Sequence, residues 1–212
     1  MNTFILDFET TGLNPYHNEI IEIAIKKFNS DKVYSDLVKP KLENGRYVSD
    51  KITSITTITN HDIHERGITQ IQACINLFTF IKENTDPETP IYLIAHNGTT
   101  FDFIYLMMLV RRYKSYCIES DITFLDVLQL YNRIVYIDTL LLSRFLLPRR
   151  QYYSQKSLCI TYKIEQLNAH RAYGDVADLE KIYTLMVSEY LQKNKINLIK
   201  IQDSNFIYNL FN

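Results

Sequence analysis

The feature that most constrains the fold is the segment FILDFE at residues 4–9, which combines the apolar character of a central strand with two acids. Apolar side chains on both faces are typical of a strand in the middle of a sheet, and they predict a first strand over residues 2–8. Positions i and i+2 of a strand share a face, so Asp7 and Glu9 project together while Phe8 points into the core. Adjacent carboxylates repel and are costly to bury, which a divalent cation would resolve; two solvated acids on an edge strand are the alternative.

Periodicity along the rest of the chain predicts an α/β fold. Apolar residues with the spacing of strands occupy residues 19–28, 31–40, 91–97 and 134–138. Helical spacing occupies residues 70–84, 101–112, 139–146 and 175–192. Three strands that can pair antiparallel, followed by alternating strands and helices, predict a mixed five-stranded sheet flanked by helices. The sequence has no repeat and no Pro/Gly-rich linker, so we expect a single domain over residues 1–212.

Composition and charge narrow the classes of function. The net charge of −1 argues against a protein that coats nucleic acid non-specifically, so any such contact must come from a local site. No apolar run reaches roughly 18 residues and no signal peptide is evident, so we expect no membrane segment. Three widely spaced cysteines, Cys74, Cys117 and Cys159, favour a reducing compartment over a disulfide framework or a cysteine-rich zinc site. We therefore expect a soluble, intracellular protein.

Two more acids and a histidine stand where strands lead into helices. Asp102 follows the strand at 91–97, and Asp175 opens the last helix directly after Gly174. Each has a simple alternative role, because the free N–H groups of a first helical turn stabilise aspartate. Strand ends and the helix starts beyond them nevertheless converge on one rim of an α/β sheet, where ligands usually bind. His170, in the loop before Asp175, is either a solvated residue or a base that takes a proton near neutral pH.

The donor atoms offered by these acids are hard oxygens. Without clustered cysteine or histidine, they favour Mg²⁺ or Mn²⁺ over zinc. Two such ions about 3.5–4 Å apart suit in-line attack on a phosphodiester, in which one activates water and the other stabilises the leaving 3′ oxygen.

The order of the motifs resembles that of a known enzyme family. The three motifs are DFETTG (7–12), HNGTTFD (96–102) and HRAYGD (170–175). They resemble the DEDDh 3′–5′ exonucleases, the DnaQ-like branch of the ribonuclease H-like fold. The resemblance implies four metal-binding acids, two Mg²⁺ ions for which Mn²⁺ can substitute, and His170 as the general base. The acids that it implies are Asp7, Glu9, Asp102 and Asp175.

Finer motif details are similar to the TREX-type DNA exonucleases. HNGTTFDF resembles their HNGxxYDF form, and HRAYGD resembles their HTAEGD. In the family, a leucine after the first motif and an isoleucine in an I-x-G-[IL]-[ST] element pack around the 3′-terminal nucleotide. The resemblance places these roles on Leu13 and Ile55, although Thr57 stands where the family has glycine.

Further residues are candidates for contact with the substrate. Arginines and tyrosines in the basic segment 144–156 would suit a single strand, by phosphate contact and base stacking; a solvated loop is the equal alternative. The second motif adds a histidine and an asparagine with a positioning role, and the first adds a threonine and a glycine. The full set of predicted substrate-binding residues is Thr10, Gly12, Leu13, Ile55, His96, Asn97, Arg149, Arg150, Tyr152 and Tyr153.

The expected activity is metal-dependent 3′–5′ hydrolysis of DNA to nucleoside 5′-monophosphates, with preference for single-stranded or frayed 3′ ends. An RNA 3′–5′ exonuclease of ribonuclease-T or oligoribonuclease type is an alternative, because the motifs do not decide the sugar. A proofreading exonuclease with a polymerase partner and a non-catalytic nucleic-acid-binding module are two others. A homodimer is open by analogy with the family.

Overall fold

The computed structural model describes residues 2–114, 122–166 and 171–194, and within them the chain forms one mixed sheet. The order of its six strands is β4-β3-β2-β1-β5-β6. β1, β2 and β3 pair antiparallel, whereas β1, β5 and β6 pair parallel, as do β3 and β4. The strands are β1 (Thr3–Thr10), β2 (Ile20–Lys27), β3 (Val33–Lys39), β4 (Ile68–Thr69), β5 (Ile91–Ala95) and β6 (Ile134–Asp138).

The predicted mixed sheet is confirmed, with one strand more than expected. All five predicted strands are present, and the additional one, β4, is only two residues long. A pair of residues carries no readable period, and β4 exists because it bonds to the edge of β3 in the folded chain.

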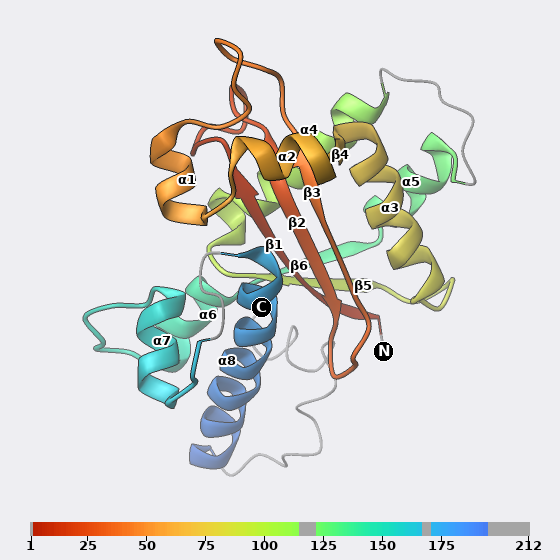
Figure 1. The fold of residues 1–212 in the computed structure, drawn as a ribbon. Helices are drawn as coiled ribbons and strands as arrows, with labels where there is room; N and C mark the ends of the chain where they lie inside the picture. Colours follow the sequence, from red (N-terminus) through yellow and green to blue (C-terminus); the bar gives the residue numbers. More distant parts are fainter. Residues whose placement is uncertain (1, 115–121, 167–170, 195–212) are drawn as a thin grey trace.

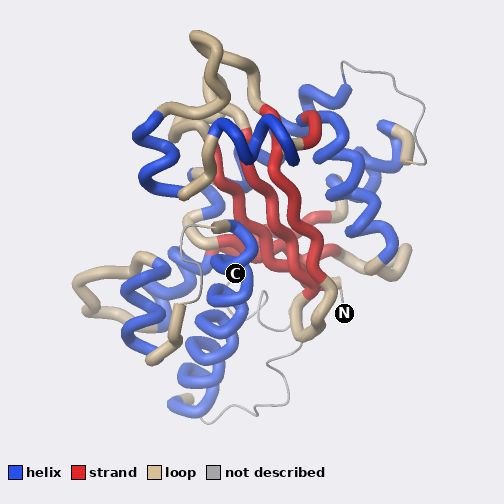
Figure 2. Tube along the Cα trace, in the orientation of Figure 1, coloured by secondary structure: helices blue, strands red, loops and turns tan. Residues whose placement is uncertain are grey.

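Helices cover both faces of the sheet (Figures 1 and 2). One face packs against α3 (Gln70–Glu83), α4 (Asp102–Lys114) and α5 (Phe124–Tyr131). The other packs against α6 (Thr139–Leu146), α7 (Gln155–Tyr162) and α8 (Ala172–Lys193). A smaller apolar cluster lies under α1 (Asp50–Thr56) and α2 (Asn60–Arg66), against the ends of β2 and β3.

The side chains of β1 alternate between these two layers, as predicted. Phe4, Leu6 and Phe8 enter the core on the α3 side. Ile5 packs on the α8 side, and the period of the strand places Asp7 and Glu9 on that same face. The central position of β1 excludes the alternative of an edge strand with two solvated acids.

The four predicted helices are present, but four short ones were missed. The last helix begins at Ala172, earlier than predicted, so Asp175 lies within its first turn rather than at its first residue. The missed helices, α1, α2, α5 and α7, have seven or eight residues, too few for a clear apolar period. Each begins at a hydroxyl side chain that accepts a backbone N–H, which is the stronger local signal. These caps are Ser49, Thr59, Thr123 and Ser154.

Two further observations concern environment. Among the described residues, no helix combines the length and apolar character needed to span a bilayer. Cys74 and Cys159 are buried free thiols, and Cys117 lies outside the described residues.

Candidate metal centre

Three carboxylates from two elements meet on the α8 face of the sheet. Asp7 and Glu9 come from β1 and Asp175 from the first turn of α8, and one oxygen of each lies within 4.8 Å of the others. All three side chains are half-buried. They meet because α8 packs on the strand face to which the odd-numbered residues of β1 point. A close set of hard oxygen donors fits a divalent cation such as Mg²⁺ or Mn²⁺.

Asp102, the fourth predicted acid, lies beside this group but outside it. It is the first residue of α4 and is only 2% exposed. Its Oδ1 accepts a hydrogen bond from the backbone N–H of Phe8 at 3.1 Å, which ties the start of α4 to β1 between Asp7 and Glu9. Its charge raises the pKa of Asp7, so the two carboxyl groups are near neighbours.

Burial and mutual repulsion make these acids reluctant to ionise. Burial raises the pKa of Asp7 well above its usual range, and the charges of Asp102, Asp175 and Glu9 raise it further. Burial, followed by the charge of Asp175, raises the pKa of Glu9 to about 8. Burial raises the pKa of Asp102 to about 7, against the lowering effect of the Phe8 hydrogen bond. A divalent cation would relieve this repulsion, so the electrostatics agree with the donor set.

His170, the predicted base, lies outside the described residues. The described part of the third motif begins at Arg171, immediately before α8. The role of His170 therefore stays a prediction from the sequence.

The turn of the second motif is fixed by Asp138. This residue caps α6 through hydrogen bonds from the backbone N–H groups of Leu140 and Leu141. The same carboxylate accepts the N–H of Asn97 at 3.1 Å and the N–H of Thr99 at 2.9 Å. Asn97 has a φ of 62°, a left-handed conformation that asparagine tolerates better than most residues.

His96 lies on the side of this turn that faces β6. Its Nδ1 is 2.9 Å from the hydroxyl of Thr139, and burial lowers its pKa. The ring is therefore neutral near pH 7, which suits positioning rather than binding of an anionic phosphate.

Two of the predicted substrate residues, Thr10 and Gly12, stabilise the loop of the first motif through contacts within the protein. Thr10 is 6% exposed, and its hydroxyl donates to the carbonyl of Gly12 at 2.6 Å. The hydroxyl of Tyr105 donates to the same carbonyl at 2.7 Å. A Cβ on Gly12 would lie 2.5 Å from Oδ1 of Asn18, so any larger residue there would displace the Asn18 amide. Leu13, the next residue, is exposed to solvent over 84% of its surface.

Ile55, the other predicted contact for the terminal nucleotide, lies on α1 and is 47% exposed. The residue that ends α1 is Thr57, with a φ of 62°. This is the left-handed conformation for which glycine is suited, and it explains why a glycine occurs at this place in the family pattern. Thr57 adopts the same turn at a steric cost.

The basic segment divides into structural and exposed residues. Arg150 bonds through its guanidinium to the hydroxyl of Thr161, and its N–H donates to the Tyr153 hydroxyl at 3.1 Å. The Tyr153 hydroxyl in turn donates to the carbonyl of Leu147 at 2.8 Å. Arg149 and Tyr152 are exposed. The described contacts thus leave Arg149 and Tyr152 as the better candidates for a strand of nucleic acid.

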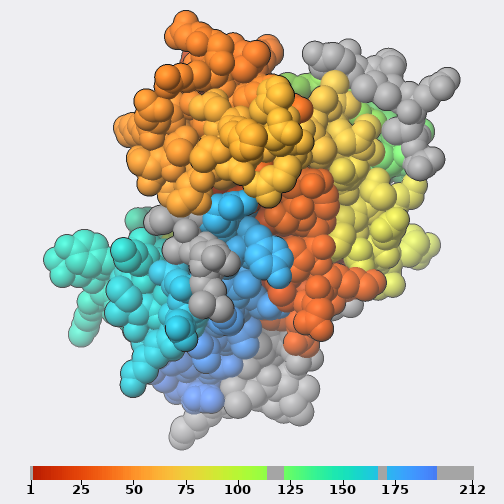
Figure 3. All heavy atoms as spheres, in the orientation of Figure 1, coloured from red at the N-terminus to blue at the C-terminus, as the bar shows by residue number. Residues whose placement is uncertain are grey.

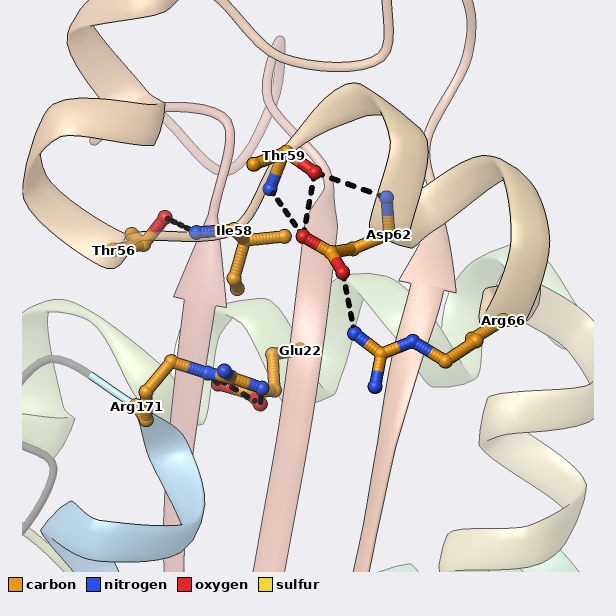
Figure 4. A network of polar contacts seen from close by, with 7 residues as sticks. All are labelled: Glu22, Thr56, Ile58, Thr59, Asp62, Arg66 and Arg171. Atoms are coloured by element: carbon orange, nitrogen blue, oxygen red, sulfur yellow. Dashed lines mark hydrogen bonds and ion pairs between the residues drawn. The ribbon is translucent and has the colours of Figure 1, made fainter.

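Two residues near the carboxylates, Gln155 and Glu22, were missed by sequence reasoning. Gln155, the first residue of α7, donates from Nε2 to the backbone carbonyl of Asp175 at 2.9 Å and to its Oδ1 at 3.2 Å. Glu22 on β2 accepts hydrogen bonds from Arg171 and from the N–H of Ala172 (Figure 4). A signal for Glu22 was present, since it is an acid within the apolar strand IIEIAI, as Asp7 is in its own strand. No comparable signal marked Gln155.

Comparison with known proteins shows the family of the chain. The family model RNase_T, described as Exonuclease, matches residues 4–183. A DNA polymerase III PolC-type protein of Thermotoga petrophila is 28% identical over 202 residues, covering 94% of this chain and 12% of that protein. Exonuclease DPD1, chloroplastic/mitochondrial, of Arabidopsis thaliana is 29% identical over 198 residues, covering 86% of this chain and 55% of that protein. The chain thus corresponds to a small part of the first relative and about half of the second.

Solved structures show the same fold. A structure of exonuclease I, described as suggesting how processivity is achieved, superposes with a TM-score of 0.68 at 15% identity, over 97% of this chain and 43% of that one. The complex of E. coli exonuclease I with a dA16 oligonucleotide gives a TM-score of 0.64 at 17% identity, over 85% of this chain and 39% of that one. The ribonuclease H-like fold expected from the motifs is confirmed, while the narrower likeness to TREX-type enzymes stays a prediction.

Proposed function

Because the chain belongs to the RNase_T family of exonucleases, we propose that it is a metal-dependent 3′–5′ exonuclease of DNA that releases nucleoside 5′-monophosphates. The observation that carries the proposal is the meeting of Asp7, Glu9 and Asp175 within 4.8 Å on one face of the sheet. Three carboxylates that repel one another this strongly have no evident structural use without a cation.

The residues of the chain divide the work of the reaction. Asp7, Glu9 and Asp175 hold Mg²⁺ or Mn²⁺, and Asp102 completes the four acids of the family pattern. When bound, the cations supply Lewis acidity and neutralise charge during attack of water on the phosphodiester. His170 takes the proton from the attacking water. The bond that breaks joins the terminal phosphorus to the 3′ oxygen of the preceding nucleotide, which leaves the phosphate on the released monophosphate.

We assign the orientation of the substrate to exposed side chains that the sequence predicts as substrate contacts. Leu13 and Ile55 are large apolar side chains that are exposed to solvent, and they offer contact area to a terminal base. Arg149 and Tyr152 offer a charge and a stacking surface to the strand beyond it. The dA16 oligonucleotide in the exonuclease I complex supports single-stranded DNA as the first substrate to test.

A time course on a denaturing gel tests this function directly. The substrates are matched 5′-labelled single-stranded DNA, duplex DNA and RNA, each with Mg²⁺ or with EDTA. We expect a Mg²⁺-dependent ladder that shortens from the 3′ end, fastest on single-stranded DNA. Faster shortening of RNA would instead establish the RNA exonuclease. No shortening of any substrate by folded protein with either Mg²⁺ or Mn²⁺ would refute the enzymatic proposal.

A matched pair of variants links the activity to the site. Asp175→Asn keeps the size of the side chain but removes a carboxylate, so we expect a folded protein with little metal-dependent activity. Asp31→Asn makes the same change at an exposed position in the turn between β2 and β3 and should retain full activity. Near-normal turnover by Asp175→Asn would show that the three-carboxylate group is not the catalytic centre.

Proofreading is the second candidate, because PolC-type polymerases are among the relatives of the chain. A proofreading exonuclease acts on a primer terminus beside a polymerase. Co-purification of a DNA polymerase with the tagged chain from its own cells would favour this role. Equal activity of the isolated chain on matched and mismatched primer ends would oppose it.

A further inference from the structure

We propose that Glu22 is a positioning residue that holds the start of α8, and with it Asp175, against β1. The proposal rests on the proposed function, since it concerns the carboxylate group of Asp7, Glu9 and Asp175. Glu22 lies on β2 directly opposite Glu9 in the strand register and is 2% exposed. It therefore sits beside the site, yet its side chain is turned into protein contacts.

The contacts of Glu22 all converge on the first residues of the third motif that the structure describes. Its Oε1 accepts from Nη2 of Arg171 at 2.6 Å, and Nε of Arg171 donates to both oxygens, at 3.0 Å to Oε1 and 3.2 Å to Oε2. Its Oε2 accepts the backbone N–H of Ala172, the first residue of α8, at 2.8 Å. Arg171 stands at the N-cap position of α8 without a capping side chain of its own. A carboxylate from a neighbouring strand thus caps the helix in its place.

Backbone hydrogen bonds connect the residues that Glu22 holds to Asp175. The carbonyl of Arg171 accepts the N–H of Asp175 at 3.0 Å, as well as the N–H of Gly174 at 2.8 Å. Fixing Arg171 and Ala172 against β2 therefore fixes the turn that carries Asp175. Gln155 holds the same turn from the other side, through the Asp175 carbonyl and carboxylate. A cation held by oxygens at about 2.0–2.6 Å has little tolerance for movement of one ligand.

The ion pair with Arg171 explains how a further carboxylate, that of Glu22, is tolerated so near the site. The charge of Glu22 raises the pKa of both Asp7 and Glu9, so by itself it adds to the repulsion. The guanidinium of Arg171 binds it by two parallel hydrogen bonds, from Nη2 to Oε1 and from Nε to Oε2, the geometry that makes a carboxylate pair strong and directional. The orange and yellow surface of α1 and α2 borders the blue surface of α8 (Figure 3), and the close-up shows Ile58 and Asp62 on the same side of the Glu22–Arg171 pair (Figure 4).

Positioning and simple electrostatics predict opposite results for one substitution. Arg171→Gln removes a positive charge close to three carboxylates, so electrostatics alone predicts tighter binding of a cation. If the pair instead holds Asp175 in place, the same change weakens binding, because the buried Glu22 loses its partner and the helix end is released. Arg171→Lys keeps the charge but cannot form the two parallel bonds, so only positioning predicts a loss for it.

The experiment measures Mn²⁺ binding by the metal-free chain, from the electron paramagnetic resonance signal of free Mn²⁺. We expect dissociation constants raised by roughly 10–100-fold in Arg171→Gln and Glu22→Gln, the usual effect of losing a partner that orients a ligand, and a smaller rise in Arg171→Lys. Arg46→Gln is the matched control. It removes the positive charge of an exposed ion pair with Asp50 and should bind Mn²⁺ normally.

The outcomes separate this proposal from the proposed function. Absence of Mn²⁺ binding by the unaltered chain, or normal binding by Asp175→Asn, would refute the metal centre itself. With those two results as expected, tighter or unchanged binding in Arg171→Gln would overturn positioning by Glu22. Circular dichroism establishes that each variant is folded. If Arg171→Gln does not fold, Arg171→Lys decides the question, because unchanged binding in that variant overturns the proposal equally.

Discussion

Replacing Glu9 by glutamine should stabilise the metal-free protein at neutral pH, although it removes a ligand. In the unfolded chain this carboxyl has a pKa of 4.5, and burial together with the neighbouring acids raises the pKa to about 8 in the fold. Between these values the folded protein retains a proton that the unfolded chain has lost. Stability therefore falls as the pH rises through this window, because the folded state binds more protons than the unfolded one.

The size of the effect follows from the width of the window. One pH unit within it corresponds to about 1.4 kcal/mol for a single group. From pH 5 to pH 7 the unaltered chain should therefore lose roughly 2–3 kcal/mol of unfolding free energy through Glu9, which the glutamine variant does not lose. In EDTA, the difference in unfolding free energy between the two proteins should therefore grow by that amount from pH 5 to pH 7. Added Mg²⁺ should reverse the order, because only the unaltered chain has the full set of carboxylates.

Urea denaturation at pH 5, 6 and 7 in EDTA, followed by circular dichroism, measures this difference. Glu88→Gln, the same change at an exposed turn, is the control and should follow the unaltered chain at every pH. Parallel pH dependences for Glu9→Gln and the unaltered chain would show that Glu9 titrates normally in the fold. That result would refute the reasoning that three crowded carboxylates are held together for a cation.

Three further predictions concern the base, the metal and the backbone. His170→Ala should bind Mn²⁺ normally and lose roughly 10²–10⁴-fold in rate; full activity in single-turnover assays would exclude the histidine as the base. The affinity for Mg²⁺ should increase between pH 6 and 8, with release of protons in calorimetry, because the carboxyls with raised pKa values near 7 and 8 must ionise. Affinity independent of pH would contradict this. Thr57→Gly should raise the unfolding free energy by about 1 kcal/mol, because glycine adopts the left-handed conformation of this residue without steric strain. Thr53→Gly, within α1, should lower the unfolding free energy by about as much. A loss of stability in Thr57→Gly would contradict the strain at Thr57.

The sequence was sufficient for the central strand and the acids on it. FILDFE is apolar on both faces, so β1 had to be buried, and a period of two residues put Asp7 and Glu9 on one side. The long helices were equally readable because their apolar residues repeat over several turns. The short helices and the two-residue strand β4 could not be predicted from the sequence, because an apolar period is detectable only over several turns or residues. The short helices depend on their caps, and β4 depends on pairing with a distant strand.

Local chemistry gave Asp102 and Asp175 two interpretations that the sequence could not separate. Each lies in the first turn of a helix, where an aspartate needs no further explanation. The folded chain shows what distinguishes them: Asp175 lies against Asp7 and Glu9, and Asp102 accepts the N–H of Phe8 on β1. Such contacts join residues that are far apart in the chain, so no local pattern encodes them.

The site shows most clearly which features the sequence determines and which only the tertiary structure decides. The identity and order of the acids were fixed by residue type and spacing, because metal chemistry needs oxygen donors and strands present them at alternate positions. The distances between those acids, the raised pKa values and the anchoring of α8 by Glu22 arise only when β1, β2 and α8 pack together. Repulsion, burial and capping act through space over a few ångströms, and only the tertiary structure brings residues 7, 22 and 175 within that range.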